Sequence, residues 1–239
     1  MKATYICVQG SYQQLEVALF SQKQCLARSM QNVRGSSTFI PLLDSLLKDH
    51  GLSLTDLSFI AVDCGPGAFT SLRVTITSIN ALAFGAGIPL IGINGLDALA
   101  QETVNMYTQQ IHKTPSNVIA LLNAYNNELY TGLYGVETNT LITPVLPQQS
   151  IAIETVLEHV STLFSDQDLL FVGNGFTLHE GLIRSSFKQR IIITDPLLQV
   201  CSVDQISVQA LEKWKKREEL SKKLIPIYLK LGTYAVRKT

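Results

Sequence analysis

Gly65-Pro66-Gly67-Ala68-Phe69-Thr70-Ser71-Leu72-Arg73 is the stretch that decides the fold. It follows an apolar run at 57–62 that predicts a strand, and it opens a segment to about Gly85 that predicts a helix. A glycine turn between a strand and a helix presents backbone N–H groups at the helix N-terminus. Such a turn can hold a phosphate, cap its own helix or support the docking of a partner, and the residues alone leave these uses open.

As a nucleotide-binding signal, the turn is incomplete. It has no Gly-Lys-Ser/Thr sequence and no GxGxxG pattern. Gly65 and Gly67 permit a tight turn and are the candidate anion or nucleotide residues. Thr70 could cap the helix, and Arg73 could reach an anion above the turn. The alternative interpretation is a purely structural turn before a capped helix.

Composition argues against several classes of protein. The chain has 239 residues, is 46% hydrophobic and carries 19 basic and 19 acidic residues, so it lacks the basic excess typical of nucleic-acid binding. Its four cysteines form no CxxC pair and its four histidines show no metal-ligand spacing, which predicts no metal site, reduced thiols and a cytoplasmic location. We expect no signal peptide and no membrane segment.

The order of predicted elements suggests two similar α/β halves. Three antiparallel strands, then helix, strand, helix, strand and helix form residues 1–110, and residues 111–239 repeat a shorter version after a linker at 112–117. The predicted helices are 36–50, 70–84, 96–107, 152–164, a segment ending at 183, and 203–217. The predicted strands are 3–9, 15–19, 25–30, 58–64, 89–93, 118–123, 128–135, 140–145, 169–172 and 191–194. We expect the last helix to pack back on the N-terminal lobe.

Carboxylates suited to catalysis are scarce. The first strand ends in Val8-Gln9-Gly10, where an Asp could have served a metal or a phosphate. Asp63, before the glycine turn, has no acidic partner nearby in sequence and is typical of a turn or cap residue. The polar residues from Asn123 to Glu128 are interpreted as an exposed hairpin turn. The sequence therefore predicts no catalytic residue.

Several motifs carry a family resemblance over nearly the whole chain. The Gly65–Arg73 stretch closely resembles the GPGSFTGLR signature of the TsaB (YeaZ) family. The similarity continues through Pro89-Leu90-Ile91-Gly92-Ile93, Leu96-Asp97-Ala98-Leu99-Ala100 and the "VGDGA"-like Phe171-Val172-Gly173-Asn174-Gly175, and it reaches the "PxYLR"-like Pro226-Ile227-Tyr228-Leu229-Lys230.

The resemblance implies the two-lobed fold of the actin, hexokinase and Hsp70 ATPase (ASKHA) class, with a duplicated β-sheet plus helices. It also implies a non-catalytic subunit that binds and activates TsaD, the transferase paralogue, with the ATPase TsaE as a third protein. Together these proteins place threonylcarbamoyl on adenosine 37 of tRNA. The tRNA is then reached only through the complex. No cofactor of its own is expected, although ATP or ADP at the complex interface and a homodimer stay open.

In the family, the first two helices contact TsaD. Here the resemblance points to helices at about 36–49 and 70–84, and the implied interface residues are Ser36, Phe39, Leu43, Phe69, Thr70, Leu72, Arg73, Ile76 and Asn80. The chain departs from the family at several positions: the Asp of "LAIDTS" is absent near Gln9, and small glycines are replaced by Ser71 and Thr75. The alternatives are an ASKHA-type nucleotide-binding enzyme and a TsaB-derived protein with another binding role.

Overall fold

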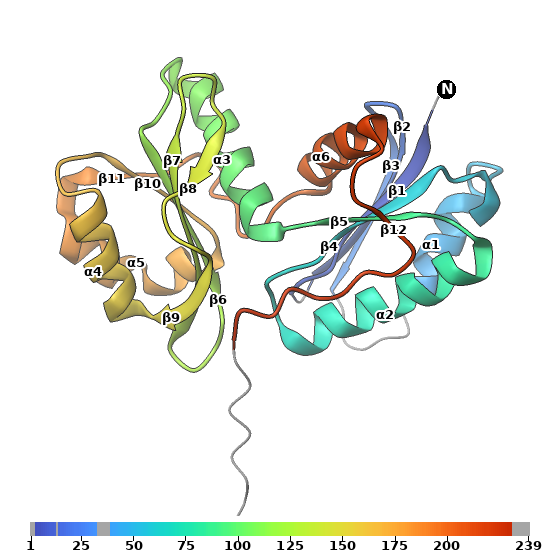
Figure 1. Cartoon of the computed structure of the whole chain (residues 1–239), viewed down its shortest axis with the longest axis horizontal. Helices are drawn as coiled ribbons and strands as arrows, with labels where there is room; N and C mark the ends of the chain where they lie inside the picture. The colour runs from blue at the N-terminus through green and yellow to red at the C-terminus, as the bar shows by residue number, and fades with distance from the viewer. Residues whose placement is uncertain (1–2, 13, 33–38, 231–239) are drawn as a thin grey trace, which may run out of the picture.

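Two β-sheets form the framework of the molecule, a computed structural model that describes residues 3–12, 14–32 and 39–230 (Figure 1). The first sheet has the strand order β12-β5-β4-β1-β2-β3. Pairs β1–β2 and β2–β3 are antiparallel, whereas β1, β4 and β5 run parallel. Its strands are β1 (Thr4–Gln9), β2 (Gln14–Ser21), β3 (Gln24–Asn32), β4 (Phe59–Asp63), β5 (Leu90–Ile93) and β12 (Leu220–Ser221).

The second sheet repeats this plan with the order β11-β10-β6-β7-β8, and β9 pairs with β7. Strands β6 and β7, and then β7 and β8, are antiparallel, whereas β6, β10 and β11 run parallel. Its strands are β6 (Asn117–Asn123), β7 (Glu128–Val136), β8 (Ile142–Pro144), β9 (Gln149–Ala152), β10 (Leu169–Val172) and β11 (Ile191–Ile192).

The helices follow the same duplication. In each half, one helix precedes the second parallel strand, one follows it, and one follows the third. The matching pairs are α1 (Phe39–Lys48) with α4 (Ile153–Leu163), α2 (Phe69–Ala86) with α5 (Asn174–Phe187), and α3 (Gly95–Ile111) with α6 (Val203–Lys216). Two short 3₁₀ segments are Leu54–Asp56 and Lys188–Arg190. The internal duplication and the predicted two-lobed ASKHA-type fold are thus confirmed.

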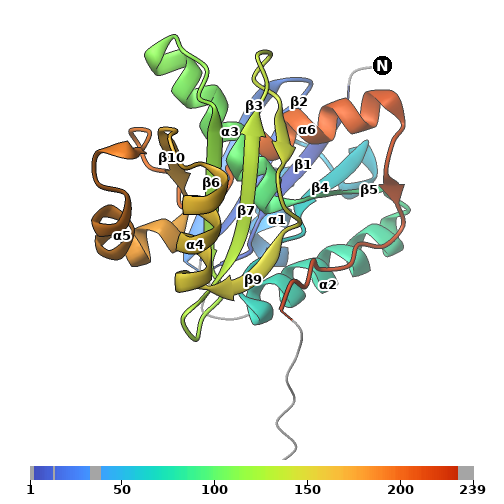
Figure 2. The ribbon, with the colours of Figure 1, turned by 60° about the vertical axis from the view of Figure 1, so that its left-hand side comes forward.

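Three hydrophobic cores hold the layers together. Helices α1 and α2 cover the outer face of the first sheet, α4 and α5 cover the outer face of the second, and α3 and α6 lie between the sheets (Figures 1 and 2). Alternate residues of β1 show how a strand serves two cores: Tyr5 and Cys7 join the central core, whereas Ile6 and Val8 join the outer one. This double burial explains why residues 5–8 of the strand are all apolar.

The third helix of each half packs on the sheet of the other half. Helix α3 lies against β6 and β7, and α6 lies against β1, β4 and β5. The exchange makes the lobes share the central core. Within the described residues, no helix has both the length and the apolar character needed to cross a membrane.

Local differences from the sequence-based expectations concern short elements and one cap. Strands β9 and β12 were not predicted, because each pairs over only a few residues and has no alternating pattern of its own. The strands predicted at 140–145 and 191–194 are shorter, and α5 extends beyond Ile183 to Phe187. The prediction of Thr70 as a cap was wrong. The N-cap residue of α2 is Ala68, without a side-chain cap hydrogen bond, and Thr70 lies inside the first turn.

Candidate functional site

The glycine turn is a crossing point of backbone segments. Gly65 has φ +95°, and its carbonyl accepts a hydrogen bond from the Gly95 N–H at 2.8 Å. A Cβ on Gly67 would lie 2.4 Å from the Ser11 carbonyl oxygen. The same Ser11 oxygen accepts the Ala68 N–H at 2.7 Å. The N–H of Ala68, the N-cap residue of α2, is therefore paired within the chain and is not free to bind an anion held by Gly65 and Gly67.

The Asp63 side chain forms hydrogen bonds with the residues of this turn. Its Oδ1 accepts the Gly65 N–H at 2.8 Å and its Oδ2 accepts Gln9 Nε2 at 3.3 Å. Burial raises the pKa of the Asp63 carboxyl, while hydrogen bonds from Ser11, Gly65 and Gln9 oppose that rise. A Cβ on Gly95 would lie 2.3 Å from Asp63 Oδ1, so this glycine is needed for the close approach. Asp63 is thus a structural turn residue, as its sequence context indicates.

A cleft of about 540 Å³ lies between the lobes. The Tyr12 hydroxyl donates to the Asn123 carbonyl oxygen at 2.8 Å, and Asn174 Oδ1 accepts the Asn123 N–H at 2.8 Å. The lining side chains are carboxamides, tyrosines, one threonine and two aliphatic groups: Gln9, Tyr12, Gln14, Asn32, Asn123, Tyr125, Asn174, Thr177, Leu178, Gln199 and Val200. None of them is charged.

This lining does not fit the metal-bound nucleotide that an ATPase-type fold implies. A polyphosphate with Mg²⁺ needs cationic donors and at least one free carboxylate. The cleft lining offers neither, and the Asp63 carboxyl already accepts the Gly65 N–H of the turn. Across the described residues, no group of three or more His, Cys, Asp or Glu side chains is arranged to hold a metal ion. Sequence reasoning missed this cleft because its residues are far apart in the chain.

The structure divides the predicted interface residues between two sides of the helices. Phe39, Leu43, Leu72 and Ile76 are buried in the core beneath α1 and α2. Phe69, Thr70 and Arg73 are exposed. Asn80 is half-buried and bonded to the C-terminal segment, and Ser36 lies outside the described residues. A partner resting on these helices would therefore reach only part of the predicted set.

The outward side of α2 is a nearly uncharged row, here called the α2 face: Phe69, Arg73, Thr77, Ala81 and Phe84. These residues recur every three or four positions, so they share one side of the helix. Phe69 is 57% exposed and Phe84 is 87% exposed. The guanidinium carbon of Arg73 lies 4.8 Å from the centre of the Phe69 ring, and Arg73 is the only charged residue of the 18-residue helix.

An apolar groove of about 880 Å³ continues this surface between α1 and the C-terminal half of α2. Its walls include Ile40 and Leu47 of α1 and Ala81, Leu82 and Gly85 of α2. Ile40 is 52% exposed. Sequence reasoning missed Ile40 and Phe84, although both lie off the buried stripe of their helices and helical periodicity places them outside.

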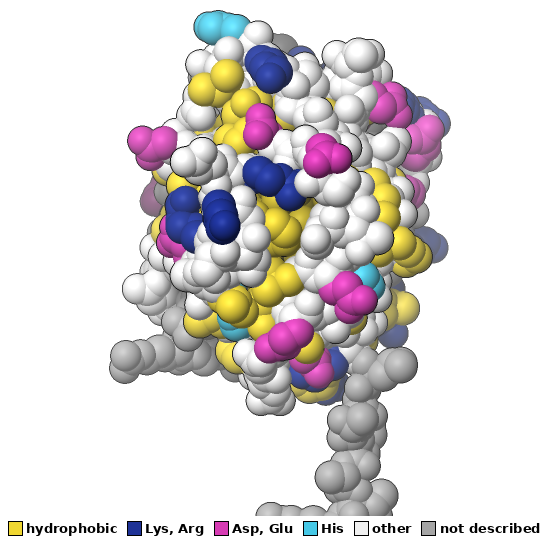
Figure 3. All heavy atoms as spheres, turned by 90° about the vertical axis from the view of Figure 1, so that its left-hand side faces the viewer, with side chains coloured by type: hydrophobic (Ala, Val, Ile, Leu, Met, Phe, Trp, Pro, Cys, Tyr) yellow, Lys and Arg dark blue, Asp and Glu magenta, His cyan; other side chains and the backbone are white. Residues whose placement is uncertain are grey.

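The outer face of the second lobe gives the contrasting case. Figure 3 shows hydrophobic side chains there among numerous charged ones. Helix α5 carries Glu180 and Arg184, which pair at 2.7 Å, and α4 carries Glu154 and Glu158. The charge-poor helix surface is therefore a property of α2 and not of its counterpart α5.

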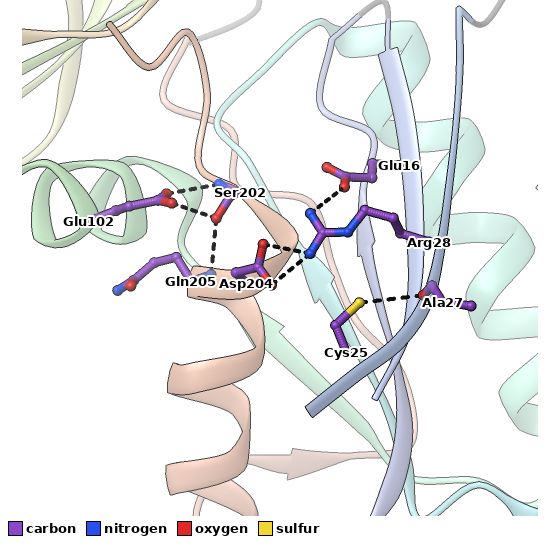
Figure 4. Close-up of polar contacts among 8 residues, drawn as sticks. All are labelled: Glu16, Cys25, Ala27, Arg28, Glu102, Ser202, Asp204 and Gln205. Atoms are coloured by element: carbon purple, nitrogen blue, oxygen red, sulfur yellow. Dashed lines mark hydrogen bonds and ion pairs between the residues drawn. The ribbon is translucent and has the colours of Figure 1, made fainter. Parts of the chain in front are cut away.

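A polar network ties α6 to both its neighbours (Figure 4). Arg28 of β3 donates to both carboxylate oxygens of Asp204 at 3.0 Å. Glu102 of α3 accepts the Ser202 N–H at 2.9 Å and also the Ser202 hydroxyl. Burial raises the pKa of the Glu102 carboxyl, and the nearby Asp204 and Glu16 add to the rise. The network fixes the N-terminus of α6, and we assign it a structural role.

Comparison with known proteins gives consistent results. The family model "TsaD: tRNA N6-adenosine threonylcarbamoyltransferase" matches residues 34–234. A Bacillus subtilis protein named tRNA threonylcarbamoyladenosine biosynthesis protein TsaB is 27% identical over 182 residues, 75% of each chain. The Escherichia coli protein of the same name is 32% identical over 100 residues, 42% of this chain and 41% of that protein.

Solved structures support the same fold. A Pseudomonas aeruginosa protein described as similar to peptidase YeaZ superposes with a TM-score of 0.73 at 23% identity, covering 95% of this chain and all of the other. YeaZ from the same organism superposes with a TM-score of 0.70 at 22% identity, with the same coverage.

Proposed function

The chain belongs to the TsaB (YeaZ) members of the family that the TsaD threonylcarbamoyltransferase model describes, and we propose that it is a non-catalytic subunit of the machinery that makes tRNA N6-threonylcarbamoyladenosine. In this proposal it binds and activates a TsaD-like transferase in the cytoplasm. A TsaE-like ATPase joins the complex, and tRNA is contacted only through the assembly. A nucleotide, where one is needed, is held at the interface between the proteins.

The α2 face carries this proposal. A surface helix ordinarily presents charged and polar side chains to water. Here one arginine stands among two exposed phenylalanines, a threonine and an alanine. Depletion of charge with enrichment of aromatic residues and arginine is typical of the centre of a protein–protein interface.

The groove beside the α2 face favours a helical partner. The small side chain of Ala81 and the absence of one at Gly85 leave room on the α2 side of the groove, and Ile40 of α1 forms the opposite wall. Ridges of one helix pack into grooves of another, so a helix of the TsaD-like partner would suit this surface. The buried residues Phe39, Leu43, Leu72 and Ile76 then support the interface from beneath without contacting the partner.

The composition of the cleft supports the non-catalytic part of the proposal. Threonylcarbamoyl transfer needs a bound substrate and groups that stabilise developing charge. The cleft lining offers carboxamides and tyrosines but no charged group, and the Asp63 carboxyl already accepts hydrogen bonds from Gly65 and Gln9. The chemistry is accordingly assigned to the partner.

The test is association with the TsaD-like transferase of the same organism, measured by calorimetry with the full chain. Thr77→Arg places a long cation in the centre of the α2 face and is expected to abolish binding. Ser185→Arg, at an exposed hydroxyl residue of α5, is the matched control and is expected to bind like the wild type. Failure of the wild-type chain to bind at micromolar concentrations would refute the proposal, as would equal binding by the two variants.

A further inference from the structure

The C-terminal segment of residues 222–230, here called the strap, lies along α2. It leaves the edge of the first sheet after β12 and runs beside α2 towards the start of that helix, as both ribbon views show (Figures 1 and 2). At its end, Lys230 Nζ lies 2.8 Å from Glu128 Oε2, at the beginning of β7 in the second lobe.

Specific hydrogen bonds hold the strap in place. Asn80 Nδ2 donates to the Leu224 carbonyl at 2.9 Å, and Asn80 Oδ1 accepts the Leu224 N–H at 2.8 Å. The Ile227 N–H donates to the Cys64 carbonyl at 2.8 Å. The side chain of Leu224 is buried in the core beneath α2. The strap is thus packed as part of the first lobe.

Other residues of the strap point outward. Ile225 is 70% exposed and Tyr228 is 51% exposed. The ring centres of Tyr228 and Phe69 are 5.6 Å apart, and Arg73 stacks over Phe69. These contacts make the strap and the α2 face one continuous surface. Several large apolar side chains are exposed side by side on it, and such a contiguous patch is typical of an interaction site, whereas a single exposed apolar residue is not.

Charge gives the surface a definite sign. Helix α2 and the strap together contain Arg73, Lys222, Lys223 and Lys230 and no acidic residue. Lys230 pairs with Glu128 of the second lobe. Arg73, Lys222 and Lys223 are the other cations beside the apolar centre, and a partner with carboxylates around an apolar patch is its complement.

The geometry points to a composite docking surface in which the outward strap residues Ile225 and Tyr228 join the α2 face to bind the same TsaD-like partner. The partner's facing surface then has an apolar centre and an acidic rim. This inference rests on the proposed function. Phe69, which contacts both Arg73 and Tyr228, is the aromatic anchor where the strap meets the helix.

Calorimetry with the full chain and the TsaD-like transferase tests the strap separately from α2. Tyr228→Ala is expected to weaken binding about tenfold or more, because it removes an aromatic ring near the centre of the surface. Tyr228→Phe keeps the ring and is expected to stay within about twofold of the wild type. Ile225→Ala is expected to weaken binding, whereas Leu182→Ala, at an aliphatic side chain of α5 that is 44% exposed, is the matched control.

Charge is tested by Lys222→Glu combined with Lys223→Glu. This variant is expected to bind more weakly at low salt and to lose most of the salt dependence of the wild type. Thermal melting of each variant reports folding independently.

The outcomes separate the two proposals. Wild-type binding that Tyr228→Ala and Ile225→Ala leave unchanged would overturn the strap inference and keep the proposed function. Strap variants that form the binary complex normally but fail to recruit the TsaE-like ATPase would also overturn it, because the strap would then belong to another partner. An absence of wild-type binding would refute the proposed function and the inference together.

Discussion

Helices α2 and α5 hold the same place in the two halves of the molecule, yet their surfaces differ. Each follows the middle parallel strand of its sheet through a glycine turn and covers the outer face of that sheet. Helix α5 presents an ion pair, Glu180–Arg184, whereas α2 presents the single charge of Arg73 between two exposed aromatic rings. The glycine turn is present in both halves and is therefore required by the duplicated fold. The charge-poor surface is present on α2 but not on α5 and is therefore the feature that we propose for docking.

Substitution of the turn glycines should produce the largest loss of stability, and the loss should be similar in the two halves. A Cβ would lie 2.4 Å from the Ser11 carbonyl oxygen in Gly67→Ala and 2.2 Å from the Leu121 carbonyl oxygen in Gly173→Ala. Each variant is expected to lose about 2 kcal/mol or more of unfolding free energy in denaturant titrations. Gly181→Ala, where a Cβ meets nothing within 4 Å, is the control and is expected to gain about 0.5–1 kcal/mol. If Gly67→Ala leaves the unfolding free energy unchanged, the fold does not require a glycine in the turn before α2.

Truncation of the exposed rings should distinguish the halves. Phe84→Ala removes a side chain that is 87% exposed, so folding should change little, but affinity for the TsaD-like transferase should fall about tenfold or more. Leu182→Ala on α5 should change neither quantity. Equal affinities of the two variants would break the comparison, because the α2 face would then be an ordinary surface.

Asn80 offers a smaller effect that is confined to the first half. Asn80→Ala removes two hydrogen bonds to Leu224 and is expected to destabilise the protein by about 1–2 kcal/mol. Hydrogen exchange should accelerate at the Leu224 amide, with Thr77→Ala on the same helix as the control. Unchanged protection of that amide would mean that Asn80 does not anchor the strap.

Glu102 provides the smallest effect, at the contact between the third helices of the two halves. Because burial raises its pKa in the folded state, the native protein holds this proton to higher pH than the unfolded chain does. The contribution of Glu102 to stability is then greatest below the ordinary glutamate pKa of about 4.3 and is lost as pH rises through the raised folded value. Glu102→Gln should flatten this part of the pH–stability curve, with a change of about 1 kcal/mol or less. A curve as steep as that of the wild type would assign the decline to other groups, such as Glu16.

The sequence predicted the duplicated α/β plan and the glycine turn well because both depend on local patterns. Apolar runs such as Phe59 to Val62 mark strands buried on both faces, and Gly65 marks a turn with positive φ. Leu72 and Ile76 show where the resemblance was too coarse. It indicated a helix as an interface, but the spacing of its apolar residues directs those two side chains to the sheet.

The cleft and the strap depend on contacts between distant residues. Tyr12 meets Asn123, and Asn80 meets Leu224, across more than a hundred residues in each case. A single sequence without local periodicity carries no signal for such pairs. Residues 222–230 form no helix, and β12 before them pairs over only two residues, so no periodic pattern predicted the path of the strap, although the family resemblance included its residues 226–230.

Hydrogen exchange of the full chain, alone and mixed with the TsaD-like transferase, tests the central claim most directly. The account predicts slower exchange in α1 and α2 on mixing, and unchanged exchange in their counterparts α4 and α5. Protection of α4 and α5 instead, or of neither pair in a mixture that forms a complex, would contradict it.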